Sequence, residues 1–237
     1  MDAHSPVAVA RVSQYSYRLQ HRRCYDSAGI GGFPIGMRSA SDNHMNEARS
    51  AQDVIREHFA RSAEVKLRTA ESCAADIERA AGLIAETFRS GGKLLICGNG
   101  GSAADSQHMA AELVGRLTRD VERPGLPAIA LTTDTSILTA YANDFDFDGV
   151  FARQVQALGR PGDVLIGIST SGSSRNVIRA AKQAKSAGMR VVTLTGDTGG
   201  LAELADVAIR VPAERTALVQ EAHLAIEHVL CHLVERA

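Results

Sequence analysis

An imidazole and a carboxylate lie one helical turn apart in the middle of the chain. His108 and Glu112 are four residues apart in Ala104–Leu113, which reads as a helix, so both lie on one face of it. Such groups are the usual partners in general acid–base catalysis. Because many such pairs are only solvent-exposed helix contacts, their role depends on what begins the helix.

A glycine loop, Cys97-Gly-Asn-Gly-Gly-Ser102, precedes this helix. Its glycines let backbone N–H groups approach a ligand, and Ser102 is placed to cap the helix. The spacing Gly98-x-Gly100-x-x-Ala103 mimics a dinucleotide fingerprint, but no acidic residue ends the next strand to hold a ribose, and nothing fits a P-loop. The loop indicates a ligand other than a dinucleotide, or a tight structural turn.

A second loop, Ser169-Thr-Ser-Gly-Ser-Ser174, places five hydroxyl groups around one glycine, directly before a helix that starts near Arg175. Hydroxyl donors and a helix N-terminus together favour a phosphate group without any Lys or Arg. Ordinary capping of the helix would need only one of these hydroxyls.

Short apolar runs alternate with helical stretches after Gly92 and predict the strands that position both loops. Continuous hydrophobicity in these runs indicates burial on both faces, and the intervening helices indicate right-handed crossovers in a parallel sheet. We expect an α/β fold, a three-layer αβα sandwich of flavodoxin or Rossmann type, with the loops at the carboxyl edge of its sheet. The five predicted strands are 93–97, 127–131, 163–168, 190–195 and 207–211.

Helical patterns flank this region on both sides. A first helix is predicted from about Ser41, a second from Val65 to Arg89 with Gly91-Gly92 as its stop, and a last one over 214–236. Residues 1–43 carry no sustained period and are predicted to be a mobile extension. Residues 44–237 are predicted to form a single domain.

Composition excludes several classes of function. The 237 residues are 45% hydrophobic with a net charge of −1, so the chain can bury a full core and has no field that would attract nucleic acid or an anionic membrane. No apolar run is long enough to span a bilayer. The scattered Cys24, Cys73, Cys97 and Cys231 indicate a reducing compartment, and we expect a cytoplasmic location.

The motifs CGNGGSA, GISTSGSS and LTGDTGG, in this order, resemble those of sugar isomerase (SIS) domains. Within that superfamily, residues 44–237 are similar to the phosphoheptose isomerases, with further matches at Arg123-Pro-Gly and Ala142-Asn-Asp144. The resemblance implies conversion of D-sedoheptulose 7-phosphate into D-glycero-D-manno-heptose 7-phosphate through an ene-diol. This is the first step of nucleotide-activated heptose biosynthesis, which supplies lipopolysaccharide or another conjugate.

The resemblance also implies the residues of the site. Glu112 and His228 are the expected acid and base, and one zinc ion per subunit is expected on His108, Glu112, Gln220 and His228. Neighbouring His223, Glu227 and His232 are predicted to be packing or surface groups. The expected substrate contacts are Asn99, Gly100, Gly101, Ser102, Glu112, Asn143, Asp144, Ser169, Thr170, Ser171, Ser174 and Gln220.

Gln220 and His228 are eight residues apart on the last helix, which is a rise of about 12 Å. Zinc ligands lie about 2 Å from the metal, so one copy of this helix can hardly supply both. We therefore expect the site at a subunit interface, within the homotetramer that the family implies and with the N-terminal helices packing between subunits.

One alternative comes from another functional class. A replication regulator of the same fold binds the initiator protein DnaA and catalyses nothing, and it resembles this chain around Leu131-Thr-Thr-Asp134. That branch lacks the groups that correspond to Glu112 and His228, which favours the enzyme.

Overall fold

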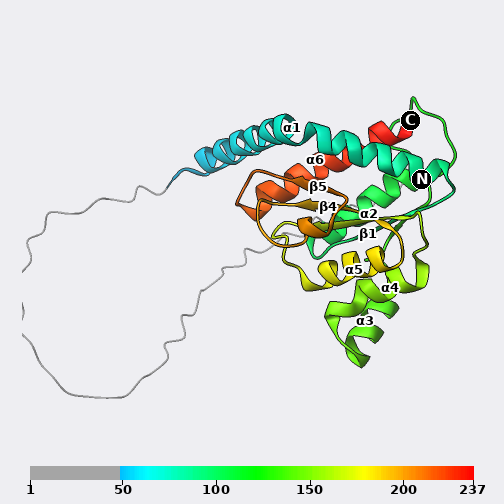
Figure 1. Ribbon diagram of the computed structural model, residues 1–237. Coiled ribbons are helices and arrows are strands. Elements are labelled where there is room, and N and C mark those ends of the chain that lie inside the picture. Colours follow the sequence, from blue (N-terminus) through cyan, green and yellow to red (C-terminus); the bar gives the residue numbers. More distant parts are fainter. Residues whose placement is uncertain (1–48) are drawn as a thin grey trace, which may run out of the picture. The chain divides into compact units, whose positions relative to one another are not determined.

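Five parallel strands form one sheet at the centre of the molecule (Figure 1). The computed structural model describes residues 49–237. The strands are β1 (Leu94–Cys97), β2 (Ala128–Ala130), β3 (Val164–Ser169), β4 (Arg190–Thr195) and β5 (Val207–Arg210), in the order β2-β1-β3-β4-β5. Each lies within one residue of its predicted ends. All six residues of β3 are buried, as expected for a strand covered on both faces.

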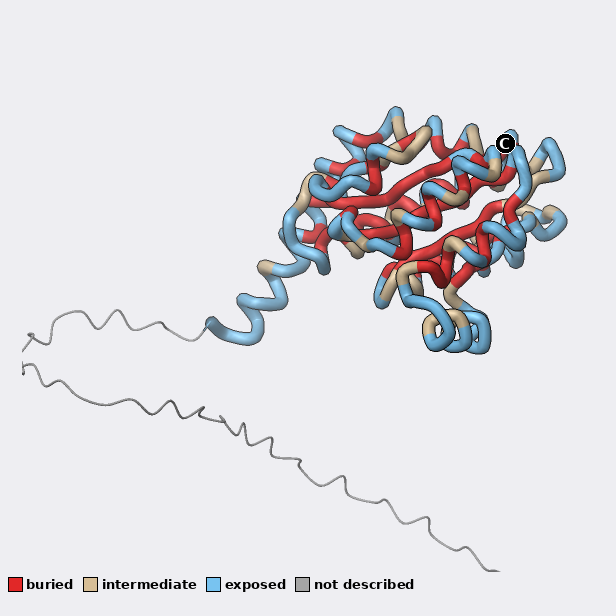
Figure 2. Tube along the Cα trace, turned by 60° about the horizontal axis from the view of Figure 1, so that its bottom comes forward, coloured by how far each residue is buried: buried red, intermediate tan, exposed pale blue. Residues whose placement is uncertain are grey.

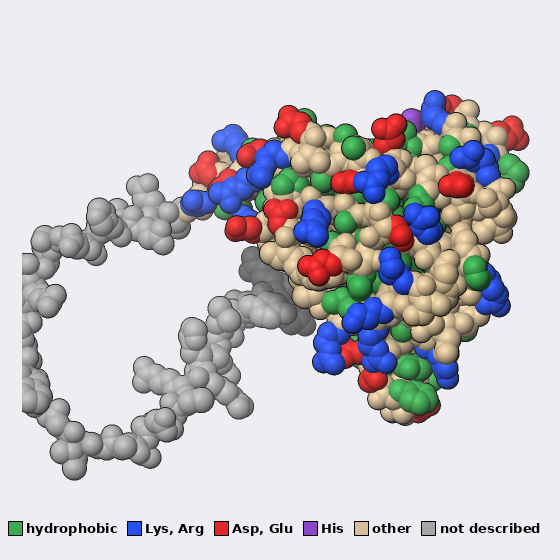
Figure 3. Space-filling view, in the orientation of Figure 1, with side chains coloured by type: hydrophobic (Ala, Val, Ile, Leu, Met, Phe, Trp, Pro, Cys, Tyr) green, Lys and Arg blue, Asp and Glu red, His purple; other side chains and the backbone are tan. Residues whose placement is uncertain are grey.

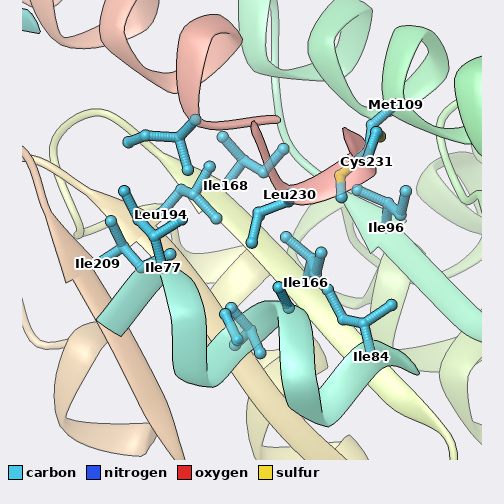
Figure 4. Packing of buried hydrophobic residues seen from close by; sticks show 14 of the residues in the cluster. Ile77, Ile84, Ile96, Met109, Ile166, Ile168, Leu194, Ile209, Leu230 and Cys231 are labelled. Carbon is cyan, nitrogen blue, oxygen red and sulfur yellow. The ribbon is translucent and has the colours of Figure 1, made fainter. Parts of the chain in front are cut away.

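Helices cover both faces of the sheet and confirm the three-layer sandwich. One face carries α1 (Ala51–Arg89), α2 (Gly101–Val114) and α6 (Thr216–Glu235), and the other carries α3 (Thr135–Asp144), α4 (Val150–Leu158) and α5 (Arg175–Ser186). Short 3₁₀ turns occur at Phe147–Gly149 and Ala202–Leu204. On the first face, Ile84 of α1, Ile166 of β3 and Leu230 of α6 meet in one apolar cluster (Figure 4).

The prediction of two helices before Gly91 is wrong, because α1 continues without a break to Arg89. The segment between Phe59 and Val65 contains neither Gly nor Pro, so nothing there interrupts the helix. The predicted stop is confirmed, since Gly91 takes the left-handed φ of 77°. The predicted start near Ser41, the mobile extension at 1–43 and the domain boundary at 44 lie outside the described residues.

The first turns of α1 expose apolar side chains that its later turns bury. Val54, Ile55 and Phe59 are 52%, 57% and 72% exposed, whereas Ile77 and Ile84 pack between the sheet and α6. Figure 2 shows this change from exposed to buried along the helix. The predicted packing of N-terminal helices between subunits stays a prediction.

The connections leave the middle of the sheet in opposite directions. The chain passes from β1 to β2 through α2 on one face and returns from β2 to β3 through α3 and α4 on the other. In such a sheet, ligands bind where the direction reverses, at the carboxyl ends of the two strands concerned. Cys97 of β1 pairs with Gly167 of β3, so the glycine loop and the hydroxyl loop emerge side by side.

A partly buried ion pair joins the amino-terminal ends of β1 and β3. The Asp163 carboxylate accepts hydrogen bonds from the backbone N–H groups of Lys93 and Arg160 at 2.9 and 2.8 Å, and Lys93 Nζ lies 2.5 Å from it. We expect Asp163→Ala to lower the free energy of unfolding by about 2–3 kcal/mol, because two backbone N–H groups and the Lys93 ammonium then lose their acceptor. Urea denaturation measures this. Asp76→Ala, which breaks a solvent-exposed pair with Arg79 on α1, should change it by less than about 0.5 kcal/mol.

Acidic and basic side chains are interspersed on the face shown in Figure 3. Within residues 49–237, no helix combines the length and apolarity required to cross a bilayer. Cys73, Cys97 and Cys231 are buried and form no disulfide among the described residues.

Candidate active site

Helices α2 and α6 bring three acid–base side chains together. His108 Nε2 lies 2.8 Å from His228 Nε2 and 3.6 Å from Glu112 Oε1. The ligand atoms of all three residues lie within 4.8 Å of one another. The structure therefore confirms the shared helix face of His108 and Glu112 and adds His228, from 120 residues further along the chain. We call His108, Glu112 and His228 the triad.

The packing of α2 against the sheet determines to which side the His108 and Glu112 side chains project. Met109 and Leu113, each one position after a triad residue, are fully buried between α2 and the sheet. His108 and Glu112 consequently project to the side of α2 that α6 covers and keep 39% and 22% of their side-chain surface exposed. A substrate can reach the triad from that exposed side.

The donor set of the triad suits a divalent metal ion. Imidazole nitrogens and a carboxylate oxygen bind zinc at about 2.0–2.2 Å, which places tetrahedral ligand atoms about 3.3 Å apart. The spacings of 2.8 and 3.6 Å lie on either side of this value. Three protein ligands with one open position is the usual composition of a catalytic metal centre.

Gln220 is the fourth expected ligand, but its side chain lies beside Gly101 and Asp105 and not in the triad of its own chain. Burial raises the pKa of Asp105, and the neighbouring Gln220 side chain opposes this rise. Gln220 Nε2 lies 1.6 Å from where a Cβ on Gly101 would stand. A side chain at position 101 would therefore displace the Gln220 amide. Sequence reasoning missed Asp105, although its place one turn before His108 was a usable signal.

Some of the expected substrate contacts in the glycine loop are exposed, and others are buried or hydrogen-bonded within the protein. Gly100, at φ 56°, and Gly101 are exposed, so their backbone can meet a ligand. Ser102 is only 5% exposed. The side-chain amides of Asn99 and Asn176 bond each other reciprocally at 2.8 Å, which ties the glycine loop to the start of α5. Nothing in the sequence pattern pointed to Asn176.

The hydroxyl loop forms a network of its own. Ser169 Oγ lies 2.9 Å from Ser174 Oγ, and Ser171 Oγ lies 2.9 Å from Ser173 Oγ. Ser174 occupies the N-cap position of α5, yet its side chain makes no capping hydrogen bond, so capping alone does not explain these residues. Ser171 and Ser173 are exposed and Thr170 and Ser174 half-buried, whereas Ser169 is buried. Ser173 was not among the expected contacts.

Gly172 holds the hydroxyl loop against the loop that follows β4. It takes a φ of 61°, and a Cβ there would stand 2.1 Å from the Thr198 carbonyl oxygen. We expect Gly172→Ala to displace the loop and raise KM for a phosphorylated substrate about tenfold, which initial-rate kinetics measures. Gly162→Ala is the matched control, because Gly162 has a φ of 89° with nothing within 4 Å. A similar rise in KM for both variants would contradict the expectation.

Asn143 and Asp144 lie at the end of α3, and the Asn143 amide donates to Asp144 Oδ1 at 2.9 Å. Helix α3 packs against α4 and the turn at Phe147–Gly149, on the side of the sheet opposite to α2 and α6, so this chain does not bring Asn143 and Asp144 to the triad (Figure 1). Their role as substrate contacts stays a prediction.

Two more ionisable groups of α6 are fully buried, His223 and Glu227. Burial raises the pKa of Glu227 to about 9, and the nearby Asp105 charge adds to this rise. Burial lowers the pKa of His223 to about 4, with the Thr195 backbone opposing. The packing role expected for both agrees with their burial.

Fold and loops together define the class of the protein. The sequence profile of the SIS domain matches residues 57–196, more than half of the chain. In this chain the glycine loop and the hydroxyl loop emerge at the reversal point of a five-stranded parallel sheet.

Individual relatives narrow the class. The chain is 58% identical to the phosphoheptose isomerase of Roseiflexus sp. (strain RS-1) over 176 residues, 74% of this chain and 88% of the relative. Among solved structures, the phosphoheptose isomerase of Neisseria gonorrhoeae has 46% identity and a TM-score of 0.75, covering 79% of this chain and 100% of that one. The enzyme of Francisella tularensis has 38% identity and a TM-score of 0.76 over 80% and 100%. The chain belongs to the phosphoheptose isomerase family.

Proposed function

We propose that this chain interconverts D-sedoheptulose 7-phosphate and D-glycero-D-manno-heptose 7-phosphate, with the triad as its acid–base centre. The observation that carries the proposal is the meeting of two imidazoles and a carboxylate on helices α2 and α6, where α2 itself begins in the glycine loop. Family membership supports the same reaction.

The reaction requires two proton transfers. A base removes the proton from the carbon beside the carbonyl and returns it one carbon along, while a second group moves a proton between the two oxygens of the ene-diol. Glu112 transfers the proton between the two carbons, and His228 transfers the proton between the two oxygens. His108 Nε2 lies 2.8 Å from His228 Nε2, so both ring nitrogens point to one place beside Glu112.

A metal ion, for which zinc is the candidate, has its ligands in His108, Glu112 and His228. When bound, it would polarise the carbonyl and stabilise the negative charge of the ene-diolate. Gln220 is proposed as a further ligand from a second subunit, because its own chain keeps it beside Gly101 and Asp105.

The phosphate is proposed to bind at the hydroxyl loop. Thr170, Ser171 and Ser174 offer donors, and the N-terminus of α5 adds a favourable dipole. The glycine loop, Asn143 and Asp144 are proposed to hold the sugar hydroxyls. Asn143 and Asp144 would come from a neighbouring subunit, since α3 lies on the far face of the sheet.

A homotetramer is proposed as the active form, with the exposed apolar start of α1 between subunits. Mixing inactive variants tests the shared site. Glu112 and His228 come from one chain, so mixed Glu112→Gln and His228→Ala chains should stay inactive. Mixed Glu112→Gln and Gln220→Ala chains should recover activity, because one interface then holds both native groups. No recovery after proven mixing would contradict a shared Gln220.

Turnover of D-sedoheptulose 7-phosphate by the purified chain tests the function directly. Chelation followed by return of zinc tests the metal. A folded, metal-loaded oligomer without turnover would overturn the proposal, and binding to DnaA would then be measured for the regulator alternative. The triad favours the enzyme, since that regulator branch lacks the counterparts of Glu112 and His228.

A further inference from the structure

The guanidinium of Arg123, in the segment between α2 and β2, bonds the end of the helix that carries Glu112. Its Nη2 donates to the Glu112 carbonyl at 3.0 Å and its Nη1 donates to the Leu113 carbonyl at 2.8 Å. The last carbonyls of a helix lack the partners that the helix interior supplies. Arg123 thus fastens the last turn of α2 through its main chain.

The same guanidinium reaches the last residue of α6, Glu235. Nη2 and Nε of Arg123 lie 2.6 and 3.1 Å from Glu235 Oε1, which also accepts the backbone N–H of Leu117 at 2.9 Å. The two side chains are only 10% and 1% exposed. Hydrogen bonds of this charge-assisted kind are short and directional. We call Arg123 and Glu235 the helix clamp.

The helix clamp joins the two helices on which the triad depends. Glu112 itself supplies one clamped carbonyl, and His228 lies seven residues before Glu235, about 10 Å along α6. A slide of α2 along α6 would therefore change the distance between Glu112 and His228 directly. Displacements of about 1 Å in such groups cost about 100-fold in rate.

We propose that Arg123 is a positioning residue, which sets the place of Glu112 relative to His228 by clamping α2 to α6. This inference rests on the proposed function of the triad. Arg123 does not touch the reacting groups and acts only through the register of the two helices.

Two variants of Arg123 separate this role from a general contribution to stability. Arg123→Met should lower kcat about 100-fold while KM changes less than about threefold. It should also weaken Co²⁺ binding, followed by visible absorption of the protein, by about tenfold or more. Arg123→Lys keeps the charge opposite Glu235 but cannot span both carbonyls and the carboxylate, so stability should return and kcat should not.

Lys93→Met is the matched control. It breaks the partly buried pair with Asp163 at the amino-terminal edge of the sheet, so the free energy of unfolding falls while kcat and Co²⁺ affinity stay at the wild-type values. Equal losses of kcat in Lys93→Met and Arg123→Met would overturn the proposal. So would an Arg123→Met enzyme with wild-type kcat and Co²⁺ affinity.

Glu235→Gln covers the case in which Arg123→Met does not fold. Gln keeps one acceptor oxygen for Arg123 and removes the charge, so kcat and Co²⁺ affinity should both fall about tenfold. Unchanged values would overturn the helix clamp. A wild-type chain that binds Co²⁺ without turnover would overturn the proposed function alone, because Co²⁺ affinity still decides between the variants.

Discussion

With zinc at saturation, because Glu112 is also a proposed metal ligand, Glu112→Gln is expected to lower kcat for D-sedoheptulose 7-phosphate by about 1000-fold. KM should change less than about threefold. The amide keeps the shape of the carboxylate but cannot take a proton from carbon. Incorporation of solvent deuterium beside the carbonyl, followed by NMR, should fall by the same factor. The isomerase would then retain binding and lose the transfer itself.

Glu122→Gln serves as the control, because Glu122 is exposed in the segment after α2 and outside the triad. It should leave both measurements unchanged. If Glu112→Gln kept deuterium exchange while His228→Asn lost it, the roles would be reversed, and His228 would be the group that serves the carbon.

Glu227→Gln is expected to stabilise the protein by about 4 kcal/mol at pH 8 and by little at pH 4. Glu227 titrates near 4.5 when solvated, and burial raises its pKa to about 9 in the fold. Between these values the unfolded chain releases a proton that the folded chain retains. Wild-type stability is therefore complete below pH 4.5 and declines as pH rises toward 9, whereas the neutral amide carries no such penalty.

Urea denaturation at pH 4, 6 and 8 with a chelator present measures this difference, since the chelator keeps metal binding at His228 from varying with pH. Glu203→Gln, on an exposed turn, should follow the wild-type pH profile. If the free energy of unfolding changed with pH in the same way for Glu227→Gln and the wild type, Glu227 would not retain its proton in the folded protein. The effect of His223, whose pKa burial lowers to about 4, is common to both proteins and cancels in the comparison.

Local sequence patterns determined most of the sheet and part of the site. The five strands are continuous apolar runs bounded by turn residues, so their positions follow from composition over a few residues. The pairing of His108 with Glu112 follows from helical spacing alone. Family motifs added His228, which no local pattern singled out.

Only the tertiary structure decided which distant groups meet. Three contacts depend on how α2 packs on α6: His108 with His228, Gln220 with Gly101, and Arg123 with Glu235. The length of α1 was misjudged because a helix ends only where a residue or contact stops it, and none does between Phe59 and Val65. Spacing along one element is fixed by backbone geometry, whereas contacts between elements depend on the packing of the whole core. For that reason the sequence pattern alone did not reveal Asn176 or the role of Arg123.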